Sequence, residues 1–286
     1  MLAMLRLAPV QVTSWGHPNT TGLEAIDYFL SCESIEPANA QSKYTEQLIK
    51  LTKLPCLYSA PETKMISSSR KKFQLPPDQI LIGIPQNLFK FHPDYDEILE
   101  QIISELPNAK FVLIKGHTNP QTERLKNRWA SNAPKTLKNA IFLQRMSQED
   151  YISLLETVDI LLDPIYFGSG NTFYESMAVG TPIVTMPGKH MRGRIVAGGY
   201  KQMKLHNAPI AADLQEYIEI AVSLAKETEL RKSLKQDIRY AAQQYLFDDQ
   251  DTADEIIEFI RAAVDCRRDT GGLLPVNWAP SKKASL

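Results

Sequence analysis

The chain has 286 residues, 43% of them hydrophobic and 23% charged, and its formal net charge at pH 7 is −1. This composition is typical of a globular protein, and the balanced charge argues against nucleic acid or an anionic membrane as a partner. Three widely separated cysteines, Cys32, Cys56 and Cys266, form no C-x-x-C pair, which argues against a disulfide framework or a zinc site and favours a reducing compartment.

The first part of the chain contains too few elements to bury a core of its own. A strand is predicted over 8–16, a loop rich in Gly, Pro, Asn and Thr over 16–22, and a short helix or strand over 23–31. We interpret residues 32–77 as a linker segment.

Residues 78–246 alternate between apolar strands and helices. Helices are predicted over 94–106 and over 147–158, where Ser147 supplies an N-cap signal. Short, continuous apolar runs predict strands over 79–86, 110–116, 140–144, 159–164, 181–187 and 208–213. This alternation indicates an α/β domain with a Rossmann-like parallel sheet and helices on both faces. Ligands of such domains bind at the carboxyl ends of the strands.

The C-terminal part begins with an amphipathic pattern that predicts a helix within residues 247–268. Residues 269–286 are rich in Gly, Pro, Ser and Lys, and we expect them to be disordered. No apolar run approaches the roughly 20 residues of a membrane span, and the interrupted start does not read as a signal peptide. A cytoplasmic protein is the default expectation.

The stretch "FGSGNTFYESMAVGTPIVTMPG" (167–188) places small, flexible residues between a strand and a helix. Such a loop can present free backbone N–H groups at a helix start to a phosphate. It can also be a plain turn with an ordinary N-cap, so the loop by itself leaves both interpretations open.

Four stretches occur in the order found in one family: "APVQVTSWGHPNTTGLEAIDYFLS", "PQNLFKFHPDYDEILEQIISELPNAKFVLI", "LLDPIYFGSGNTFYESMAVGTPIVTMPG" and "RGR". Together they resemble the catalytic C-terminal half of the protein O-linked N-acetylglucosamine transferase / SPINDLY family over most of residues 5–265. Each motif alone is modest support, whereas four in register are specific.

The resemblance implies a GT-B architecture, in which two Rossmann-like domains face a cleft and the C-terminal one holds most of a UDP-sugar. It implies inverting, metal-independent transfer of a sugar, usually N-acetylglucosamine, to Ser or Thr of a protein acceptor, with no cofactor besides the donor. Residues 1–31 would be the end of the N-terminal domain, and the family's tetratricopeptide repeats have no counterpart here. The alternative is a truncated, catalytically incompetent UDP-sugar-binding module that needs a separate chain to supply the missing domain.

The resemblance assigns donor-binding roles around the diphosphate. Lys90 matches a lysine that contacts the diphosphate, where an ammonium would stabilise the UDP leaving group, and Asn87 matches a glutamine that helps hold the nucleotide. Without the resemblance, Lys90 reads as a solvated lysine at a helix start. Gly170, Asn171 and Thr172 match three loop residues that touch the diphosphate. Glu175 matches an acidic residue that binds the ribose.

The resemblance also assigns a loop near the transferred sugar and the acceptor. That loop contains Gly16, His17, Pro18 and Thr20, with His17 in place of a tyrosine. His17 is a candidate general base, and the alternative is a histidine in an exposed turn.

Further residues match family positions that contact the uracil and the phosphates. Met146 and Gln148 occupy positions that hold uracil, while Tyr151 replaces a histidine and either packs on the base or fills the core at a helix start. Arg194 matches a family arginine, although surface helices commonly carry arginines. Finally, "DYD" (94–96) looks like a metal-binding Asp-x-Asp motif, but acidic residues are favoured at a helix start, so we expect no metal there.

Overall fold

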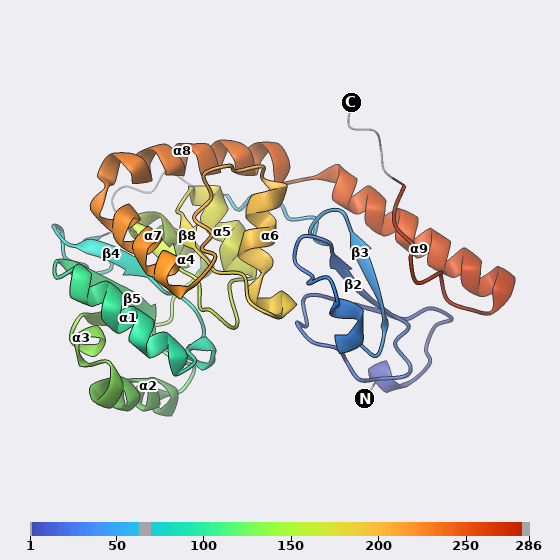
Figure 1. The fold of residues 1–286 in the computed structure, drawn as a ribbon, viewed down its shortest axis with the longest axis horizontal. Coiled ribbons are helices and arrows are strands. Elements are labelled where there is room, and N and C mark those ends of the chain that lie inside the picture. The colour runs from blue at the N-terminus through green and yellow to red at the C-terminus, as the bar shows by residue number, and fades with distance from the viewer. Residues whose placement is uncertain (1, 63–69, 282–286) are drawn as a thin grey trace.

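The computed structural model describes residues 2–62 and 70–281, which form two lobes of unequal size (Figure 1). The smaller lobe contains a sheet of three parallel strands in the order β1-β2-β3. These strands are β1 (Val12–Ser14), β2 (Tyr28–Cys32) and β3 (Gln47–Leu51). All five residues of the central strand β2 are buried. Of the helix or strand predicted over 23–31, the structure therefore shows a strand, which begins at Tyr28.

The predicted linker, residues 32–77, instead contributes β3 to this sheet. Backbone pairing joins β2 and β3 along five residues. The strand reads "QLIKL", with Leu48, Ile49 and Leu51 buried and Lys50 exposed. A run this short is recognisable as a strand only beside the partner strand that buries it.

The last helix, α9 (Gln250–Thr270), packs against the smaller lobe (Figure 1). The Phe259 ring meets Tyr28 of β2 edge to face, with ring centres 5.3 Å apart. We expected disorder from residue 269 onward, but the structure places residues 271–281 in contact with this lobe. The Leu274 N–H donates to the Tyr28 hydroxyl at 2.9 Å, and Trp278 packs on Phe259. Residues 282–286 lie outside the described residues.

The larger lobe contains a five-stranded parallel sheet in the order β6-β5-β4-β7-β8. Its strands are β4 (Ile80–Gly83), β5 (Ala109–Ile114), β6 (Ala140–Leu143), β7 (Ile160–Leu162) and β8 (Ile183–Val184). The sixth strand predicted over 208–213 forms only a single bridge, between Ile210 and Thr185.

Helices cover this sheet on both faces, as the predicted fold class requires. They are α1 (Asp94–Glu105), α2 (Asn119–Asn132), α3 (Pro134–Lys138), α4 (Gln148–Thr157), α5 (Asn171–Val179), α6 (Ile195–Gln202), α7 (Leu214–Lys226) and α8 (Thr228–Tyr245). Short 3₁₀ helices are η1 (Leu2–Met4), η2 (Ala40–Lys43), η3 (Leu88–Lys90) and η4 (Met191–Gly193). Helix α1 contacts α7, and α4 contacts α5. Right-handed crossovers place these two pairs on opposite faces.

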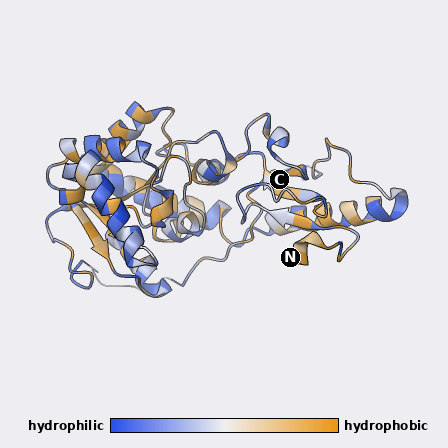
Figure 2. Cartoon of the chain, turned by 90° about the horizontal axis from the view of Figure 1, so that it is seen from below, coloured by the Kyte–Doolittle hydropathy of each residue, from blue (hydrophilic) through white to orange (hydrophobic). Residues whose placement is uncertain are grey.

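Hydrophobicity follows the layers, with strand segments mainly hydrophobic and outer helices mixed or hydrophilic (Figure 2). In the described ranges, no helix combines the length and the apolar character that crossing a membrane requires.

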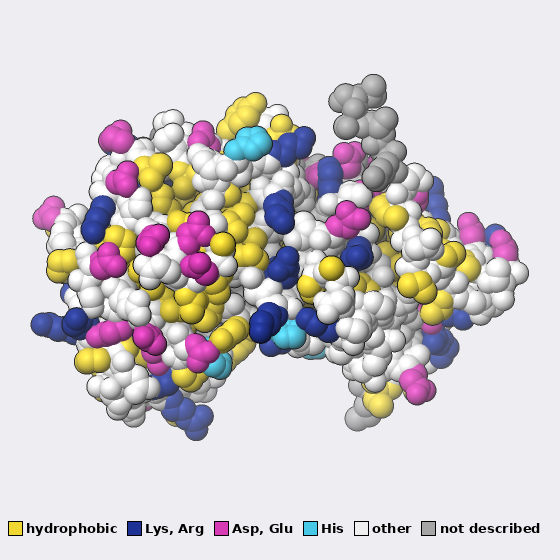
Figure 3. Space-filling model, viewed as in Figure 1, with side chains coloured by type: hydrophobic (Ala, Val, Ile, Leu, Met, Phe, Trp, Pro, Cys, Tyr) yellow, Lys and Arg dark blue, Asp and Glu magenta, His cyan; other side chains and the backbone are white. Residues whose placement is uncertain are grey.

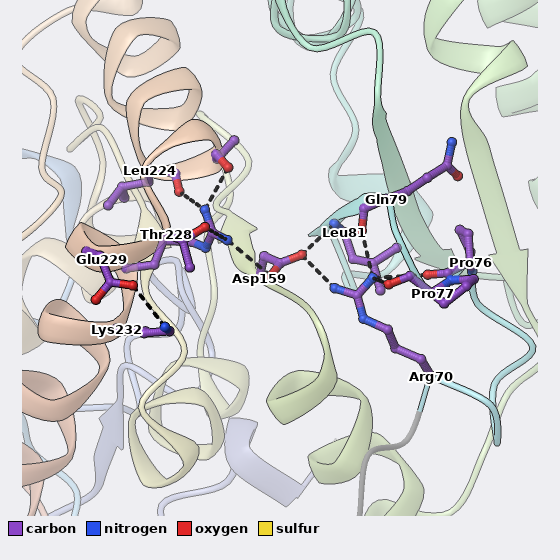
Figure 4. A network of polar contacts seen from close by, with 12 residues as sticks. Arg70, Pro76, Pro77, Gln79, Leu81, Asp159, Leu224, Thr228, Glu229 and Lys232 are labelled. Atoms are coloured by element: carbon purple, nitrogen blue, oxygen red, sulfur yellow. Dashed lines mark hydrogen bonds and ion pairs between the residues drawn. The ribbon is translucent and has the colours of Figure 1, made fainter.

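At the amino end of the larger sheet, Asp159 fixes the start of β7 against β4 (Figure 4). Its carboxylate accepts hydrogen bonds from the Leu81 N–H at 2.8 Å and from Arg70 at 3.0 Å. The Arg70 guanidinium also donates to the carbonyls of Pro76, Pro77 and Gln79. This end of the sheet is therefore closed by polar contacts, and the opposite, carboxyl end remains for a ligand.

Two glycines in α6 bring the lobes together. A Cβ on Gly198 would lie 2.4 Å from Ile35 of the smaller lobe, and a Cβ on Gly199 would lie 2.1 Å from the Phe173 ring of the larger lobe. Only glycines allow α6 to pack this closely on both sides at once.

The chain crosses between the lobes twice, and the two crossings contact each other. The first precedes β4 and the second joins α8 to α9. The Asp248 N–H donates to the Tyr58 carbonyl at 3.0 Å, and Ser59 Oγ donates to the Asp248 carboxylate at 2.7 Å. Asp248 has a φ of 50°, a left-handed conformation that Asp tolerates better than most residues.

Candidate functional site

A cleft of about 900 Å³ lies between the two lobes at the carboxyl ends of the larger sheet. The larger lobe lines it with segments that follow β4, β5 and β6 and with the start of α5. The predicted site residues that line this cleft are Gly16, Pro18, Asn87, Lys90, Met146, Gln148, Tyr151, Gly170, Asn171 and Thr172. Chain positions from 16 to 172 thus meet in one place.

Lys90 ends η3, shortly after β4. Its Nζ donates to Gln86 Oε1 and to the Gly168 carbonyl, both at 2.7 Å, and lies 4.4 Å from the centre of the Phe167 ring. Burial lowers the pKa of Lys90 to about 8, and the nearby charge of Asp163 acts in the opposite direction. The ammonium is therefore held by neutral groups, and an anion entering the cleft would find it without a bonded carboxylate.

Asp163, directly after β7, anchors the loop that carries these groups. Its buried carboxylate accepts hydrogen bonds from the Ser169 N–H at 2.7 Å, from Ser169 Oγ at 2.8 Å and from Thr185 Oγ1 at 2.9 Å. Ser169 Oγ also accepts from Gln86 Nε2 at 2.9 Å. Burial raises the pKa of Asp163, while the bonds from Ser169 and Thr185 lower it. A continuous chain of hydrogen bonds thus connects Asp163 through Gln86 to Lys90.

Two glycines in this loop have different roles. A Cβ on Gly168 would lie 2.4 Å from the Asp163 carboxylate, so a side chain there would displace the anchor. A Cβ on Gly170 would meet nothing within 4 Å, and Gly170 is the N-cap of α5 with no side-chain cap. The first N–H groups of α5 have no intrahelical partner, which makes this helix start favourable for an anion.

Tyr151 and Glu175 lie beside the start of α5. The Tyr151 hydroxyl lies 2.7 Å from Thr172 Oγ1 and donates to the Pro85 carbonyl at 3.2 Å, so Tyr151 both lines the cleft and braces it. Glu175 is buried and does not line the cleft. Burial raises the pKa of Glu175, and contact with the Gln148 amide lowers it. The structure therefore places Glu175 behind the cleft lining, and its ribose contact stays a prediction.

In the smaller lobe, buried Glu46 holds the predicted acceptor loop. Its carboxylate accepts from Thr20 Oγ1 and from the N–H and hydroxyl of Thr21. Although burial acts to raise it, these hydrogen bonds hold the pKa of Glu46 below its usual value. Thr20 thus fixes the loop and does not line the cleft. His17 is exposed, between the lining residues Gly16 and Pro18.

Arg194 and the "DYD" stretch have contacts away from the cleft. The Arg194 guanidinium donates to the Gly188 carbonyl at 3.0 Å and does not line the cleft. Asp96 is buried and accepts from Arg128 and from the Trp129 indole, both at 2.8 Å. Asp94 accepts from the Tyr166 hydroxyl at 2.7 Å. The two aspartates therefore stabilise packing around α1.

Two cations that line the cleft were not predicted from the sequence. Lys115 follows β5 directly, and Arg145 comes two residues after β6. In the described residues, neither belongs to an ion pair. Their positions at strand ends were a usable signal, since ligands bind there. The smaller lobe adds Trp15 and Cys56, to which the sequence analysis assigned no role.

Comparison with known proteins agrees with this architecture. The family model for glycosyl transferase family 41 matches residues 56–256. The SPINDLY protein of Solanum lycopersicum, named a probable UDP-N-acetylglucosamine–peptide N-acetylglucosaminyltransferase, is 28% identical over 243 residues, which is 82% of this chain and 25% of that protein. A UDP-glucose:protein N-beta-glucosyltransferase of Actinobacillus pleuropneumoniae is 26% identical over 240 residues, 82% of this chain and 37% of that protein.

Among solved structures, an O-GlcNAc transferase mutant from Thermobaculum terrenum matches with a TM-score of 0.74 and 24% identity, covering 90% of this chain and 48% of that one. The GT-B fold is thereby confirmed. The chain spans about a quarter of the length of the SPINDLY relative. The roles of individual site residues stay predictions. The family model covers well over half of the chain, and the chain belongs to glycosyl transferase family 41.

Proposed function

We propose that the chain is a UDP-sugar-dependent glycosyltransferase that moves N-acetylglucosamine to Ser or Thr of a protein acceptor, with inversion and without a metal or other cofactor. The observation that carries the proposal is the charge of the cleft. Lys90, Lys115 and Arg145 line it together with the start of α5, and none of the described carboxylates does. A diphosphate is the part of a UDP-sugar that such a surface binds best.

Each part of the donor has a proposed position. The diphosphate lies against Lys90 and the start of α5, the uracil against Met146, Gln148 and Tyr151, and the sugar toward the smaller lobe. Asn87 adds an amide near the nucleotide, as the resemblance implies. The names of the relatives support UDP-sugars as the donor class, since they include both N-acetylglucosaminyl and glucosyl transfer.

In the proposed reaction, an acceptor hydroxyl attacks the anomeric carbon from the face opposite the diphosphate. The bond between that carbon and the phosphate oxygen breaks, and the electron pair leaves with UDP. Lys90 stabilises the negative charge that grows on the diphosphate. His17, exposed at the rim of the cleft, is the candidate to receive the hydroxyl proton or to contact sugar or acceptor.

A second candidate function is a UDP-sugar-binding module that needs a partner chain for catalysis. It is favoured by four apolar side chains of the smaller lobe that are exposed to solvent. They are Leu2 (72% exposed), Met4 (62%), Leu5 (54%) and Leu7 (65%). Exposed apolar surface of this kind is typical of a contact with another domain or chain. We further propose that the protein acts in the cytoplasm, since its three cysteines are free thiols.

The test is calorimetric titration of UDP and UDP-GlcNAc into the folded chain and into Lys90→Ala, followed by a transfer assay with serine peptides. Lys138→Ala, an exposed lysine of α3, is the matched control. Micromolar binding that Lys90→Ala weakens and Lys138→Ala preserves supports the donor site. Transfer by the chain alone favours the enzyme, and binding without transfer favours the module. No binding by a folded chain overturns both.

A further inference from the structure

Basic side chains gather where the two lobes meet (Figure 3). The smaller lobe contributes Lys43 at the end of η2. The larger lobe contributes Lys189, His190 and Arg192 from the segment between β8 and α6. These four residues are called the junction cluster below; Lys43, Lys189 and His190 are exposed, and Arg192 is half-buried.

Two hydrogen bonds hold the junction cluster together across the lobes. Lys43 Nζ donates to the Lys189 carbonyl at 2.8 Å, and the Arg192 guanidinium donates to Asn19 Oδ1 at 2.8 Å. Burial, together with the charges of Lys43, Arg192 and Lys189, lowers the pKa of His190. The cations therefore face one another closely enough to interact.

The charge of the junction cluster is not neutralised within the described ranges 2–62 and 70–281, where Lys43, Lys189 and Arg192 belong to no ion pair. The buried carboxylates of the smaller lobe have partners of their own. Glu36 accepts from Ser31 and Tyr44, and Glu46 from Thr20 and Thr21. Like charges held together without counter-charges create a positive potential that attracts acidic groups.

The junction cluster borders the cleft on two sides. The Arg192 carbonyl accepts from the Gly168 N–H at 2.9 Å, so the backbone of the cluster is bonded to the loop before α5. Asn19, which Arg192 holds, directly follows the lining residue Pro18. A polypeptide that brings a hydroxyl past the 16–22 loop would therefore pass beside the cluster.

We propose that the junction cluster binds acidic residues of the polypeptide that carries the acceptor hydroxyl. The inference rests on the proposed function, because it names the acceptor class of the same cleft. An acidic peptide is favoured over nucleic acid, since the formal net charge of the whole chain is −1, whereas domains that bind nucleic acid are typically basic overall. Rim charges of this kind act mainly on association and on its salt dependence.

The test compares two fluorescent peptides with the same central serine, one flanked by Glu and the other by Gln. Binding is measured by anisotropy with saturating UDP at low and at high salt. We expect the Glu peptide to bind about tenfold more tightly at low salt, and high salt to remove the difference. The variant Lys43→Gln/Lys189→Gln/Arg192→Gln should lose that preference. The control Lys71→Gln/Lys138→Gln/Lys226→Gln, with the same change of net charge on other surfaces, should keep it.

UDP titration of the same proteins separates the two proposals. If UDP binds to the wild type and to the junction variant alike while both peptides bind equally, the acidic-acceptor inference fails and the proposed function stands. The acidic-acceptor inference also fails if the control variant loses the preference as fully as the junction variant. If the Glu preference depends on the cluster but UDP does not bind, the surface is supported and the donor site fails. Tighter binding of a single-stranded oligonucleotide than of the Glu peptide overturns the choice of partner.

Discussion

The larger lobe presents the cleft with side chains fixed by buried hydrogen bonds, whereas the smaller lobe presents an exposed loop. In the larger lobe, Asp163, Ser169 and Gln86 connect in one network that ends at Lys90. On the other side, His17 and Asn19 are exposed, and the 16–22 loop is held mainly by Glu46. In the proposed function, the fixed wall would hold one constant donor, and the exposed loop would meet acceptors of varied shape.

The sheets behind the two walls of the cleft also differ in how well they are covered. The larger lobe has a five-stranded sheet covered by helices, while the smaller lobe has three strands and depends on the distant helix α9 for cover. Disturbing the larger lobe should therefore affect donor binding, and disturbing the smaller lobe should affect the acceptor. Four substitutions or changes of condition test this division, beginning with the one expected to have the largest effect.

Lys90→Met should lower transfer by about 10²–10³-fold, because the variant loses the cation that stabilises the leaving diphosphate. Its melting temperature should stay equal or rise, since a partly desolvated ammonium without a bonded carboxylate is removed. Transfer kinetics and thermal unfolding measure the two effects. Lys138→Met, on the exposed surface of α3, should change neither, and an active Lys90→Met would remove this lysine from the mechanism.

Asp163→Asn should cost about 1–3 kcal/mol of stability and weaken UDP binding about tenfold, because the loop before α5 loses its anchor. Urea unfolding and UDP titration measure these losses. Asp159→Asn, at the other end of β7, is the matched control. It should lower stability but leave UDP affinity unchanged, and equal loss of affinity in both variants would show that the effect is not local to the cleft.

Raising the pH from 7 to 9 should weaken UDP-GlcNAc binding about tenfold. A lysine whose pKa is lowered to about 8 is mostly charged below that pH and mostly neutral above it, so binding above pH 8 must take up a proton. Titrations in buffers of different ionisation enthalpy measure that uptake. In Lys90→Met, the pH dependence should flatten, and an unchanged profile would assign it to another group.

Glu46→Gln should raise the KM for the acceptor a few-fold and cost about 1 kcal/mol of stability, because it weakens the bonds that hold Thr20 and Thr21. The affinity for UDP should not change. Steady-state kinetics with donor and acceptor varied in turn separate the two effects. A loss of donor affinity here would contradict the division of labour between the lobes.

The sequence predicted the larger lobe well because its buried strands are continuous apolar runs that need no partner to be recognised. The strand β3 was not predicted, since "QLIKL" forms a strand only by pairing with β2. The strand predicted over 208–213 was too long, because the run pairs with Thr185 alone, through the backbone of Pro209 and Ala211 on either side of Ile210. Local pattern thus decides strands that are buried on both faces, and tertiary pairing decides short strands at the edge.

The site was predictable where residues follow strands or lie in a motif, as for Lys90 and the 170–172 loop. Lys115 and Arg145 also lie at strand ends and line the cleft, but the sequence analysis assigned no role to either. The Asp163 network could not be found from the sequence, because it joins positions 86, 163, 169 and 185 through side chains. For Arg194 the motif match predicted a donor contact, and the structure shows a backbone partner instead.

The two chain crossings between the lobes have a mechanical consequence. Asp248 of one crossing is hydrogen-bonded to Tyr58 and Ser59 of the other, so the two connections are tied to each other at one place. A change in the angle between the lobes would therefore have to bend both connections together.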